Sequence, residues 1–144
     1  SDFIIGYPGE TKNDFLQTLK LIKETKFINS YSFIYSSRPG TPASELDNIE
    51  IKTAKNRLIE LQKLLENINT ENKKNFLYQS TEVLFENKMK NQNKYFGRDK
   101  FLNSVVVESD KDLTGRLLNI KIDNYNHNSL FGKVLNYKST NYAV

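Results

Sequence analysis

The apolar residues of the chain follow two different periods, and the change of period divides it. In the first half, short β-rich runs at 2–6 and 31–35 are separated by apolar residues at helical spacing. Each run ends at a cluster of chain-breaking residues, at 7–10 and 36–40. The pattern predicts strand, helix and strand, which is a βαβ unit with parallel strands and a right-handed crossover.

The helix of this unit has a recognisable start, because Thr11 stands three residues before Asp14 in an approximate capping box. We expect the helix to end near Thr25. Its apolar positions are Phe15, Leu16, Leu19 and Ile22. One βαβ unit leaves sheet faces bare, so we interpret these residues as the closing portion of a larger α/β barrel or sheet. In such folds the loops after the strands form the ligand-binding end.

A second amphipathic helix is predicted from Ile51 to Asn69, where apolar residues alternate at steps of three and four. These residues are Ala54, Leu58, Leu61, Leu65 and Ile68. The pattern lasts less than three heptads, so packing against one surface is favoured over a coiled coil. We expect this helix to be a connector, and the Asn- and Lys-rich stretch 69–75 to be a boundary.

From about Leu77 the period changes to two, which indicates short strands. The predicted strands are 82–86, 101–107, 117–122 and 129–135, and the turn-rich links are 87–94, 109–115 and 123–128. Several short strands without a helix signal predict a small all-β barrel of the OB or SH3-like size.

Composition narrows the possible chemistry. The 144 residues include no Cys and one His, which excludes a cysteine nucleophile, a Cys-ligated zinc or cluster, and a multi-histidine metal site. No apolar run reaches the roughly 18 residues of a membrane span, so we expect a cytoplasmic protein. The net charge of +4 is modest, and excess Lys is also typical of an ordinary solvated surface. The chain begins at Ser1 and its sole Met is Met89, so we interpret it as a piece of a longer protein.

Two loops of the first half carry candidate binding groups. The loop 6–11 presents backbone amides at a helix start, which can meet an anion, but its spacing favours an ordinary tight turn, since it is not GxGxxG and has no Lys. The loop 35–42 offers hydroxyls and Arg38, which can grip a carboxylate or phosphate or be a plain surface charge. His127 lies between two Asn residues in a predicted turn, and we give it no catalytic role.

The second half interleaves basic and aromatic residues. Lys88, Lys90, Lys94 and Arg98 alternate with Met89, Tyr95 and Phe96. Basic residues neutralise phosphates and exposed aromatic rings stack on unpaired bases, so the pattern suits RNA. A Lys-rich hairpin whose aromatic rings face the core fits the same pattern, and the residues alone leave both interpretations open.

Longer motifs add a resemblance. The string DFIIGYPGETKNDF at 2–15 resembles the DxIxGFPGETxxDF motif of the radical S-adenosylmethionine methylthiotransferases, and SFIYSSRPGTPA at 32–43 resembles that family's FxYSxRxGTxA motif. The segments 83–107, 115–123 and 126–135 are similar to the TRAM domain that ends these enzymes. These three motif matches occur in the family's order and span nearly the whole chain, which is a more specific signal than any single motif.

Within the family, Arg-Pro-Gly at 38–40 is similar to the branch that modifies isopentenyl-adenosine next to the tRNA anticodon. The branch that modifies a ribosomal protein tends to carry an acidic residue at the position of Arg38. Two departures are Tyr7 in place of Phe, and Asn87 where the TRAM hairpin commonly has Gly. Threonylcarbamoyl-adenosine and a ribosomal protein remain the alternative substrates.

The resemblance implies a parent enzyme with a flavodoxin-like domain, a radical-SAM barrel and a TRAM barrel, using S-adenosylmethionine and two 4Fe-4S clusters. Residues 1–46 would be the C-terminal part of the radical-SAM domain, 47–76 a connecting amphipathic helix, and 77–144 the TRAM domain. The chain has no Cys to hold a cluster, so we expect it to be inactive alone. The implied partner is tRNA, and we expect a monomer without membrane association.

The resemblance also suggests site residues, all as hypotheses. No catalytic residue and no metal ligand is expected in this chain. The proposed cofactor-binding residues are Ile5, Gly6, Gly9, Glu10, Tyr35, Ser36 and Arg38, and the proposed RNA contacts are Lys88, Lys90, Tyr95, Arg98 and Lys133. The competing hypotheses are a small RNA-binding protein that acts by itself, and a barrel that only docks against its own enzyme or a protein partner.

Overall fold

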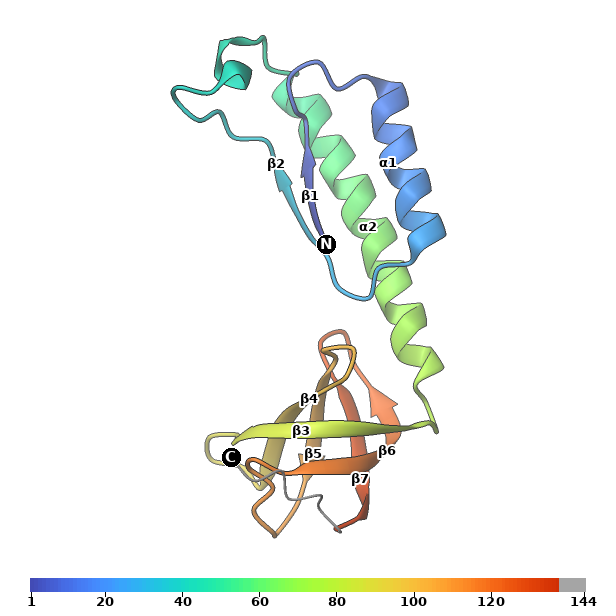
Figure 1. The fold of residues 1–144 in the computed structure, drawn as a ribbon. Helices are drawn as coiled ribbons and strands as arrows, with labels where there is room; N and C mark the ends of the chain where they lie inside the picture. The colour runs from blue at the N-terminus through green and yellow to red at the C-terminus, as the bar shows by residue number, and fades with distance from the viewer. Residues whose placement is uncertain (138–144) are drawn as a thin grey trace. The chain divides into compact units, whose positions relative to one another are not determined.

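The computed structural model describes residues 1–137, which form two compact units (Figure 1). The contacts divide the chain into residues 1–70 and residues 71–144. Each unit is described by itself below. The predicted domain boundaries after residues 46 and 76 stay predictions. The last seven residues of the predicted third segment, 138–144, lie outside the described residues.

The first unit begins with the predicted βαβ arrangement. Strand β1 (Asp2–Ile5), helix α1 (Lys12–Thr25) and strand β2 (Tyr31–Ile34) follow one another. The two strands pair in parallel, from Asp2 opposite Tyr31 to Ile5 opposite Ile34. A short 3₁₀ turn, η1 (Pro42–Glu45), separates β2 from the second long helix. The predicted strand, helix and strand are therefore confirmed.

The start of α1 is the predicted capping box. The Asp14 amide donates to Thr11 Oγ1 at 3.2 Å, and the Thr11 amide donates to Asp14 Oδ2 at 2.8 Å. The Thr11 hydroxyl also donates to Asp14 Oδ2, at 2.7 Å. These bonds lower the pKa of Asp14, with the Thr11 hydroxyl as the largest cause and its amide next. At the other end Lys26 adopts the left-handed conformation, and its amide donates to the Ile22 carbonyl.

Helix α2 (Ile51–Asn75) is longer than the sequence predicts. The predicted helix end at Asn69 is wrong, because residues 69–75 are helical. The division between the two units nevertheless falls within this stretch, after Thr70. No Pro or Gly interrupts this stretch. Lys73 and Lys74 lie in the last turn, where positive charge is favourable at the negative end of the helix dipole.

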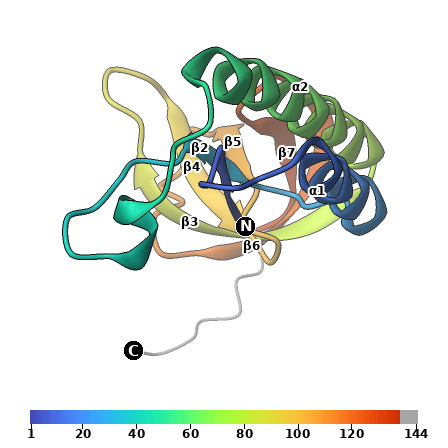
Figure 2. The same cartoon turned by 90° about the horizontal axis from the view of Figure 1, so that it is seen from above.

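The core of the first unit lies on one face of the two-stranded sheet. Phe3 and Ile5 of β1 pack with residues of α1 and α2, which lie side by side in both views (Figures 1 and 2). The buried helix residues are Phe15, Leu19, Ile22 and Leu61, with Leu58, Leu65 and Ile68 partly buried. Ala54 is also buried. The predicted apolar stripe of α2 is therefore confirmed.

The opposite face of the same sheet is bare. Ile4 is 61% exposed, Tyr31 70% and Phe33 54%. Ile4 and Phe33 are direct partners across the two strands, so these side chains form one apolar patch. Parallel sheets are normally covered on both faces. Burial of this patch would therefore need a further layer of protein on top of it.

The second unit is a closed five-stranded barrel, in agreement with the predicted small all-β fold (Figure 1). Its strands are β3 (Ser80–Lys88), β4 (Lys94–Asp99), β5 (Ser104–Glu108), β6 (Leu117–Tyr125) and β7 (Leu130–Asn136). The order around the barrel is β3-β4-β5-β7-β6, and β3 pairs with β6 to close it. Among the barrel strands within residues 80–136, β5 and β7 pair in parallel and the other pairs are antiparallel. This barrel is compatible with an OB-like fold.

Strand β4 was not predicted, and the predicted strand 101–107 is wrong in its first part. Residues 94–99 form β4, a turn follows, and β5 begins at Ser104. The turn is fastened by the buried Asp99 carboxylate, which accepts from the amides of Phe101 and Asn103 at 2.9 Å each. Leu102 has φ 62°, a left-handed conformation that ends the strand pattern. A local side-chain bond therefore overrides the β propensity of this segment.

The interior of the barrel is filled by residues that alternate along its strands. They include Val83, Phe85, Tyr95, Val105, Val107, Leu113, Leu118, Ile120, Ile122 and Leu130. Gly97 of β4 faces this interior at a close strand approach, and a Cβ there would lie 2.4 Å from the Leu84 carbonyl oxygen. Among residues 1–137, no helix is both long and apolar enough to cross a membrane.

Candidate functional site

The predicted site residues fall into two regions, one in each unit. The first region is formed by the loops that follow β1 and β2, which end at the same edge of the sheet because the strands are parallel (Figure 1). The Tyr35 amide donates to the Ile5 carbonyl at 2.8 Å. The Tyr7 and Tyr35 rings meet edge to face, with centroids 5.1 Å apart. The structure therefore brings the two predicted loops into contact.

Gly6 lets the first loop fold back against α2. Its φ is +77°, and a Cβ on it would lie 2.8 Å from the Cβ of Ala54. Only Gly tolerates both this backbone conformation and this approach. The Gly6 amide donates to Glu10 Oε2 at 2.6 Å, and the Glu10 amide donates to the Tyr7 carbonyl at 2.9 Å. The loop is therefore a closed turn with an internal carboxylate.

The second oxygen of Glu10 binds Arg57 of α2. Arg57 Nη1 lies 2.7 Å from Glu10 Oε1 and donates also to the Glu10 carbonyl at 2.9 Å. The side chains are 12% and 13% exposed, so the pair is shielded from water. The Arg57 guanidinium lies 5.6 Å from the Phe15 ring centroid. Both carboxylate oxygens of Glu10 are thus engaged within the unit, which gives Glu10 a structural role in this loop.

Sequence reasoning missed Arg57. A signal was present, because Arg57 lies three residues after Ala54 and four before Leu61 and so falls within the apolar stripe of α2. A charged residue at such a position has to find a partner when the stripe is buried. The identity of that partner, 47 residues away, is not readable from spacing.

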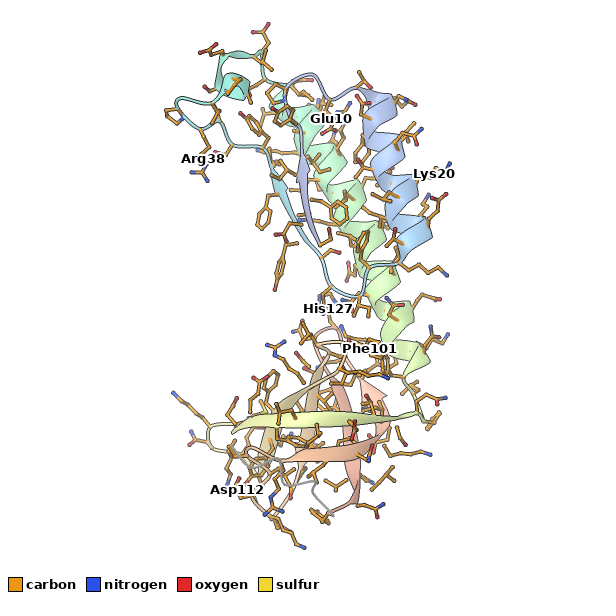
Figure 3. All side chains as sticks on the ribbon, in the orientation of Figure 1. Glu10, Lys20, Arg38, Phe101, Asp112 and His127 are labelled. Carbon is orange, nitrogen blue, oxygen red and sulfur yellow. The ribbon has the colours of Figure 1, made fainter. Side chains whose placement is uncertain are left out.

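The remaining residues of this region differ in exposure. Gly9, Ser36 and Arg38 are exposed. The Arg38 side chain extends away from its loop (Figure 3), while its carbonyl accepts from the Thr41 hydroxyl at 2.8 Å. The Tyr35 hydroxyl oxygen is buried and has no hydrogen-bond partner among residues 1–137. A buried polar atom of this kind calls for a partner from outside these residues. No group of three or more His, Cys, Asp or Glu side chains suited to a metal ion occurs in the described part of the chain.

The second region is the β3–β4 hairpin of the barrel. Its tip holds an open depression of about 800 Å³. The lining residues are Lys88, Met89, Lys90, Asn91, Gln92, Asn93 and Glu108. Lys88 and Lys90 have no ion-pair partner among residues 1–137. Two unpaired ammonium groups beside three amides, with a single carboxylate, form a surface that can bind phosphate.

Tyr95 does not lie on this surface. It is 4% exposed and belongs to the barrel core, with the Lys88 ammonium 5.8 Å from its ring centroid. Side chains alternate along a strand, so the neighbouring Phe96 faces outward. The sequence did not decide which of the two rings is buried. The register does, because Tyr95 and Gly97 point inward together with Val83 and Phe85.

Arg98 and Lys133 are cations with carboxylate partners. Arg98 Nε lies 3.1 Å from Glu86 Oε1, and its guanidinium lies 5.3 Å from the Phe96 ring centroid. Lys133 Nζ lies 4.0 Å from Asp123 Oδ2. The predicted RNA contacts therefore divide into unpaired lysines at the hairpin tip and paired cations elsewhere on the barrel.

Two further charged groups fasten turns of the second unit. Lys73 donates to the carbonyl oxygen of His127, and burial lowers the pKa of Lys73. Asp112 Oδ1 accepts from the Thr114 amide at 3.0 Å, and this bond is the main cause of the lowered pKa of Asp112. The predicted absence of a catalytic role for His127 is not tested by these contacts.

Comparison with known proteins gives the chain its relatives. No protein-family model matches it. It is 46% identical over 134 residues to the tRNA-2-methylthio-N(6)-dimethylallyladenosine synthase of Pelagibacter ubique, covering 93% of this chain and 30% of that protein. The enzymes of the same name from Vesicomyosocius okutanii and Buchnera aphidicola are also 46% identical, over 94% and 92% of the chain and 31% and 30% of their own lengths.

The chain thus spans about 30% of the length of the curated relatives that it matches. The match covers both units, since it includes more than nine-tenths of the residues. The predicted resemblance to the methylthiotransferases is confirmed: the chain is homologous, over nearly its whole length, to a segment of the tRNA-2-methylthio-N(6)-dimethylallyladenosine synthases.

Proposed function

We propose that the chain is the C-terminal part of a tRNA methylthiotransferase that adds a methylthio group to isopentenyl-adenosine next to the anticodon. The observation that carries the proposal is the 46% identity over 93% of the chain to an enzyme named for that product. Arg38, which matches the tRNA branch of the family, is consistent with it. The missing two-thirds of such an enzyme would hold the clusters and perform the radical step, because this chain contains no Cys.

The first unit would be the closing portion of the radical-SAM barrel. Its two strands are parallel and covered by helices on one face alone. The exposed Ile4, Tyr31 and Phe33 then belong to the face that the earlier strands and the barrel interior would cover. The exposed apolar patch therefore supports a larger sheet in the complete enzyme. In that sheet these side chains would be buried, which accounts for their apolar character.

The loops after β1 and β2 would lie at the S-adenosylmethionine end of that barrel. The buried and unpartnered Tyr35 hydroxyl supports a polar ligand there. Ile5, Gly6 and Glu10 would shape this end, because their backbone groups are bonded to Tyr35, Glu10 and Arg57, and the exposed Gly9 would contribute backbone groups to the cofactor. When bound, the cofactor supplies the radical and the methyl group. In the complete enzyme, Arg38→Ala should reduce tRNA modification; unchanged modification would remove Arg38 from the site.

The barrel would be a TRAM domain that binds tRNA, chiefly through phosphate contacts of Lys88 and Lys90. Among residues 1–137 neither ammonium group has an ion-pair partner, and this, with the amides beside them, supports the proposal. OB-like barrels commonly bind oligonucleotides with the hairpin between their first two strands, which is an argument from fold analogy.

Titration of the full chain with tRNA at several salt concentrations tests this proposal. Affinity should fall steeply as salt rises, by a slope of about 0.7–0.9 per phosphate contact on logarithmic axes. No binding at low salt would refute tRNA binding by the barrel. The coding region upstream of Ser1 gives an independent test: a CxxxCxxC run there supports the enzyme, and a start codon directly before Ser1 supports a small RNA-binding protein instead.

A further inference from the structure

The outer face of the barrel carries an apolar row across three neighbouring strands. Phe96 of β4 lies opposite Val106 of β5, and Val106 lies opposite Phe131 of β7. Adjacent strands are about 4.8 Å apart, so the two Phe residues stand roughly 10 Å apart at their backbones. Val106 is buried although it faces away from the core. The strand register therefore places these three apolar residues side by side on the outer surface of the barrel.

An open depression of about 560 Å³ lies at the Phe131 end of this row. Its lining residues include the aromatic Phe131 and Tyr137 and the basic Lys94 and Lys133. Phe131 has no ring or cation contact among residues 1–137. The volume is within the range of about 300–1,000 Å³ that is typical of small-ligand sites. We call this depression the β5–β7 pocket.

The charges of the β5–β7 pocket distinguish it from the hairpin tip. Its two lysines are matched by two carboxylates, Glu108 and Asp123, and Asn124 adds an amide. Lys94 lies opposite Glu108 across the strands, and Lys133 is within 4.0 Å of Asp123. A site for phosphate alone would carry an excess of cations, and this one does not.

This composition suits a nucleobase. An aromatic ring stacks on the base, and carboxylate and amide groups accept from or donate to the polar edge of an unpaired base. The pocket is adjacent to the hairpin tip, because Glu108 lines both depressions. A single strand with phosphates at Lys88 and Lys90 can therefore place a neighbouring nucleotide at the pocket.

We propose that the β5–β7 pocket takes one unpaired base of the bound RNA, with Phe131 as its stacking platform. The proposal rests on the proposed function, in that it assumes RNA binding by the barrel. Under this proposal the two surfaces have different roles. The hairpin tip binds phosphate regardless of sequence, and the pocket selects RNA with unpaired nucleotides.

The test compares three RNAs: a hairpin with an unpaired loop, the same hairpin with abasic loop nucleotides, and a blunt duplex. Each is titrated by fluorescence anisotropy with the full chain and with Phe131→Leu, which keeps bulk but removes the aromatic face. Phe101→Leu is the matched control, because Phe101 is an exposed aromatic residue of the barrel that does not line the pocket (Figure 3). Circular dichroism checks that each variant is folded.

Phe131→Leu should weaken binding of the unpaired-loop hairpin by at least about fivefold and leave the abasic hairpin and the duplex unchanged. Phe101→Leu should bind all three RNAs as the wild type does. Equal affinities of wild type and Phe131→Leu for the loop hairpin would refute base binding in the pocket but would leave RNA binding by the barrel intact. A protein-docking surface would give that same result. No salt-dependent binding of any RNA by the wild type would overturn both the pocket and the proposed function.

Discussion

Glu10 and Arg57 are 47 residues apart in the chain, yet their side chains meet at 2.7 Å in a largely buried ion pair. Arg57 also donates to the Glu10 backbone, and Glu10 in turn accepts from the Gly6 amide. Two hydrogen bonds from Arg57 thereby hold the loop after β1 against α2, and the Gly6–Glu10 bond closes the loop on itself. The conformation of this loop depends on α2 as much as on its own glycines.

Arg57→Leu should destabilise the first unit by about 1.5–3 kcal/mol, because it leaves the Glu10 carboxylate shielded from water without its charged partner. Urea unfolding of the full chain followed by far-ultraviolet circular dichroism measures this loss. Arg57→Lys should recover only part of it, since Lys keeps the charge but lacks the planar guanidinium that lies 5.6 Å from the Phe15 ring centroid.

The matched control is the exposed pair of Lys20 and Glu24 on α1, 3.8 Å apart and more than 60% exposed on both sides (Figure 3 labels Lys20). Glu24→Gln should change the free energy of unfolding by no more than about 0.5 kcal/mol. Equal losses for Arg57→Leu and Glu24→Gln would contradict the assigned role of Arg57.

Asp14 should make the first unit sensitive to acid. The Thr11 hydroxyl and amide lower its pKa below the ordinary 3.8, so the folded state binds fewer protons at that carboxyl than the unfolded state does. The stability that Asp14 contributes is therefore fully present above about pH 4 and is lost as pH falls through the lowered pKa. Thermal unfolding of wild type and Asp14→Asn across this pH range measures it.

The difference in stability between wild type and Asp14→Asn should be largest near neutral pH and shrink below about pH 4. A difference that stays constant with pH would show that the capping bonds do not depend on the charge. Thr11→Ser keeps the capping oxygen and should preserve the pH dependence, while Thr11→Val should weaken it.

Asp99 should be essential for the turn between β4 and β5. Its buried carboxylate accepts from the amides of Phe101 and Asn103, and from Asn103 Nδ2 at 3.0 Å. Asp99→Leu should destabilise the barrel by about 1–3 kcal/mol for each buried donor left unsatisfied. Asp112→Leu is the control, because Asp112 also accepts a turn amide but is exposed. A smaller loss for Asp99→Leu than for Asp112→Leu in thermal unfolding would refute this.

Lys88 and Arg98 should differ in RNA binding although both were proposed as contacts. Lys88→Gln removes an ammonium group without an ion-pair partner among the described residues, so it should weaken tRNA binding and reduce the salt slope by just under one unit. Arg98 is already paired with Glu86 at 3.1 Å, so Arg98→Gln should change both quantities less. Anisotropy titrations at three salt concentrations measure both variants, and a larger effect of Arg98→Gln would contradict the expectation.

The features that the sequence predicts well are those set by near neighbours. Thr11 and Asp14 are three residues apart, and their capping box forms as expected. The stripe that contains Ala54 and Leu61 shows its buried face directly through its spacing. The change of period near Leu77 predicts the barrel, because strands in a closed sheet alternate between core and solvent.

What the sequence does not predict depends on contacts between distant residues or on competing local bonds. Strand β4 carries charges on its outer face and Gly97 on its inner one, so it lacks an apolar alternation. The pairing of Glu10 with Arg57 depends on how α2 packs. Whether Tyr95 or Phe96 is available to RNA depends on strand register, which a shift of one residue reverses.

The strand order of the barrel constrains how it is made. Because β7 lies between β5 and β6, both of those strands keep a free edge until the ribosome has released residues up to Asn136. During that interval the edges of β5 and β6 can pair with other chains. A chain that ends before β7 would keep both edges unpaired and would be prone to aggregation. Closure of this barrel therefore requires β7, and a chain that lacks this strand would keep unpaired edges on β5 and β6.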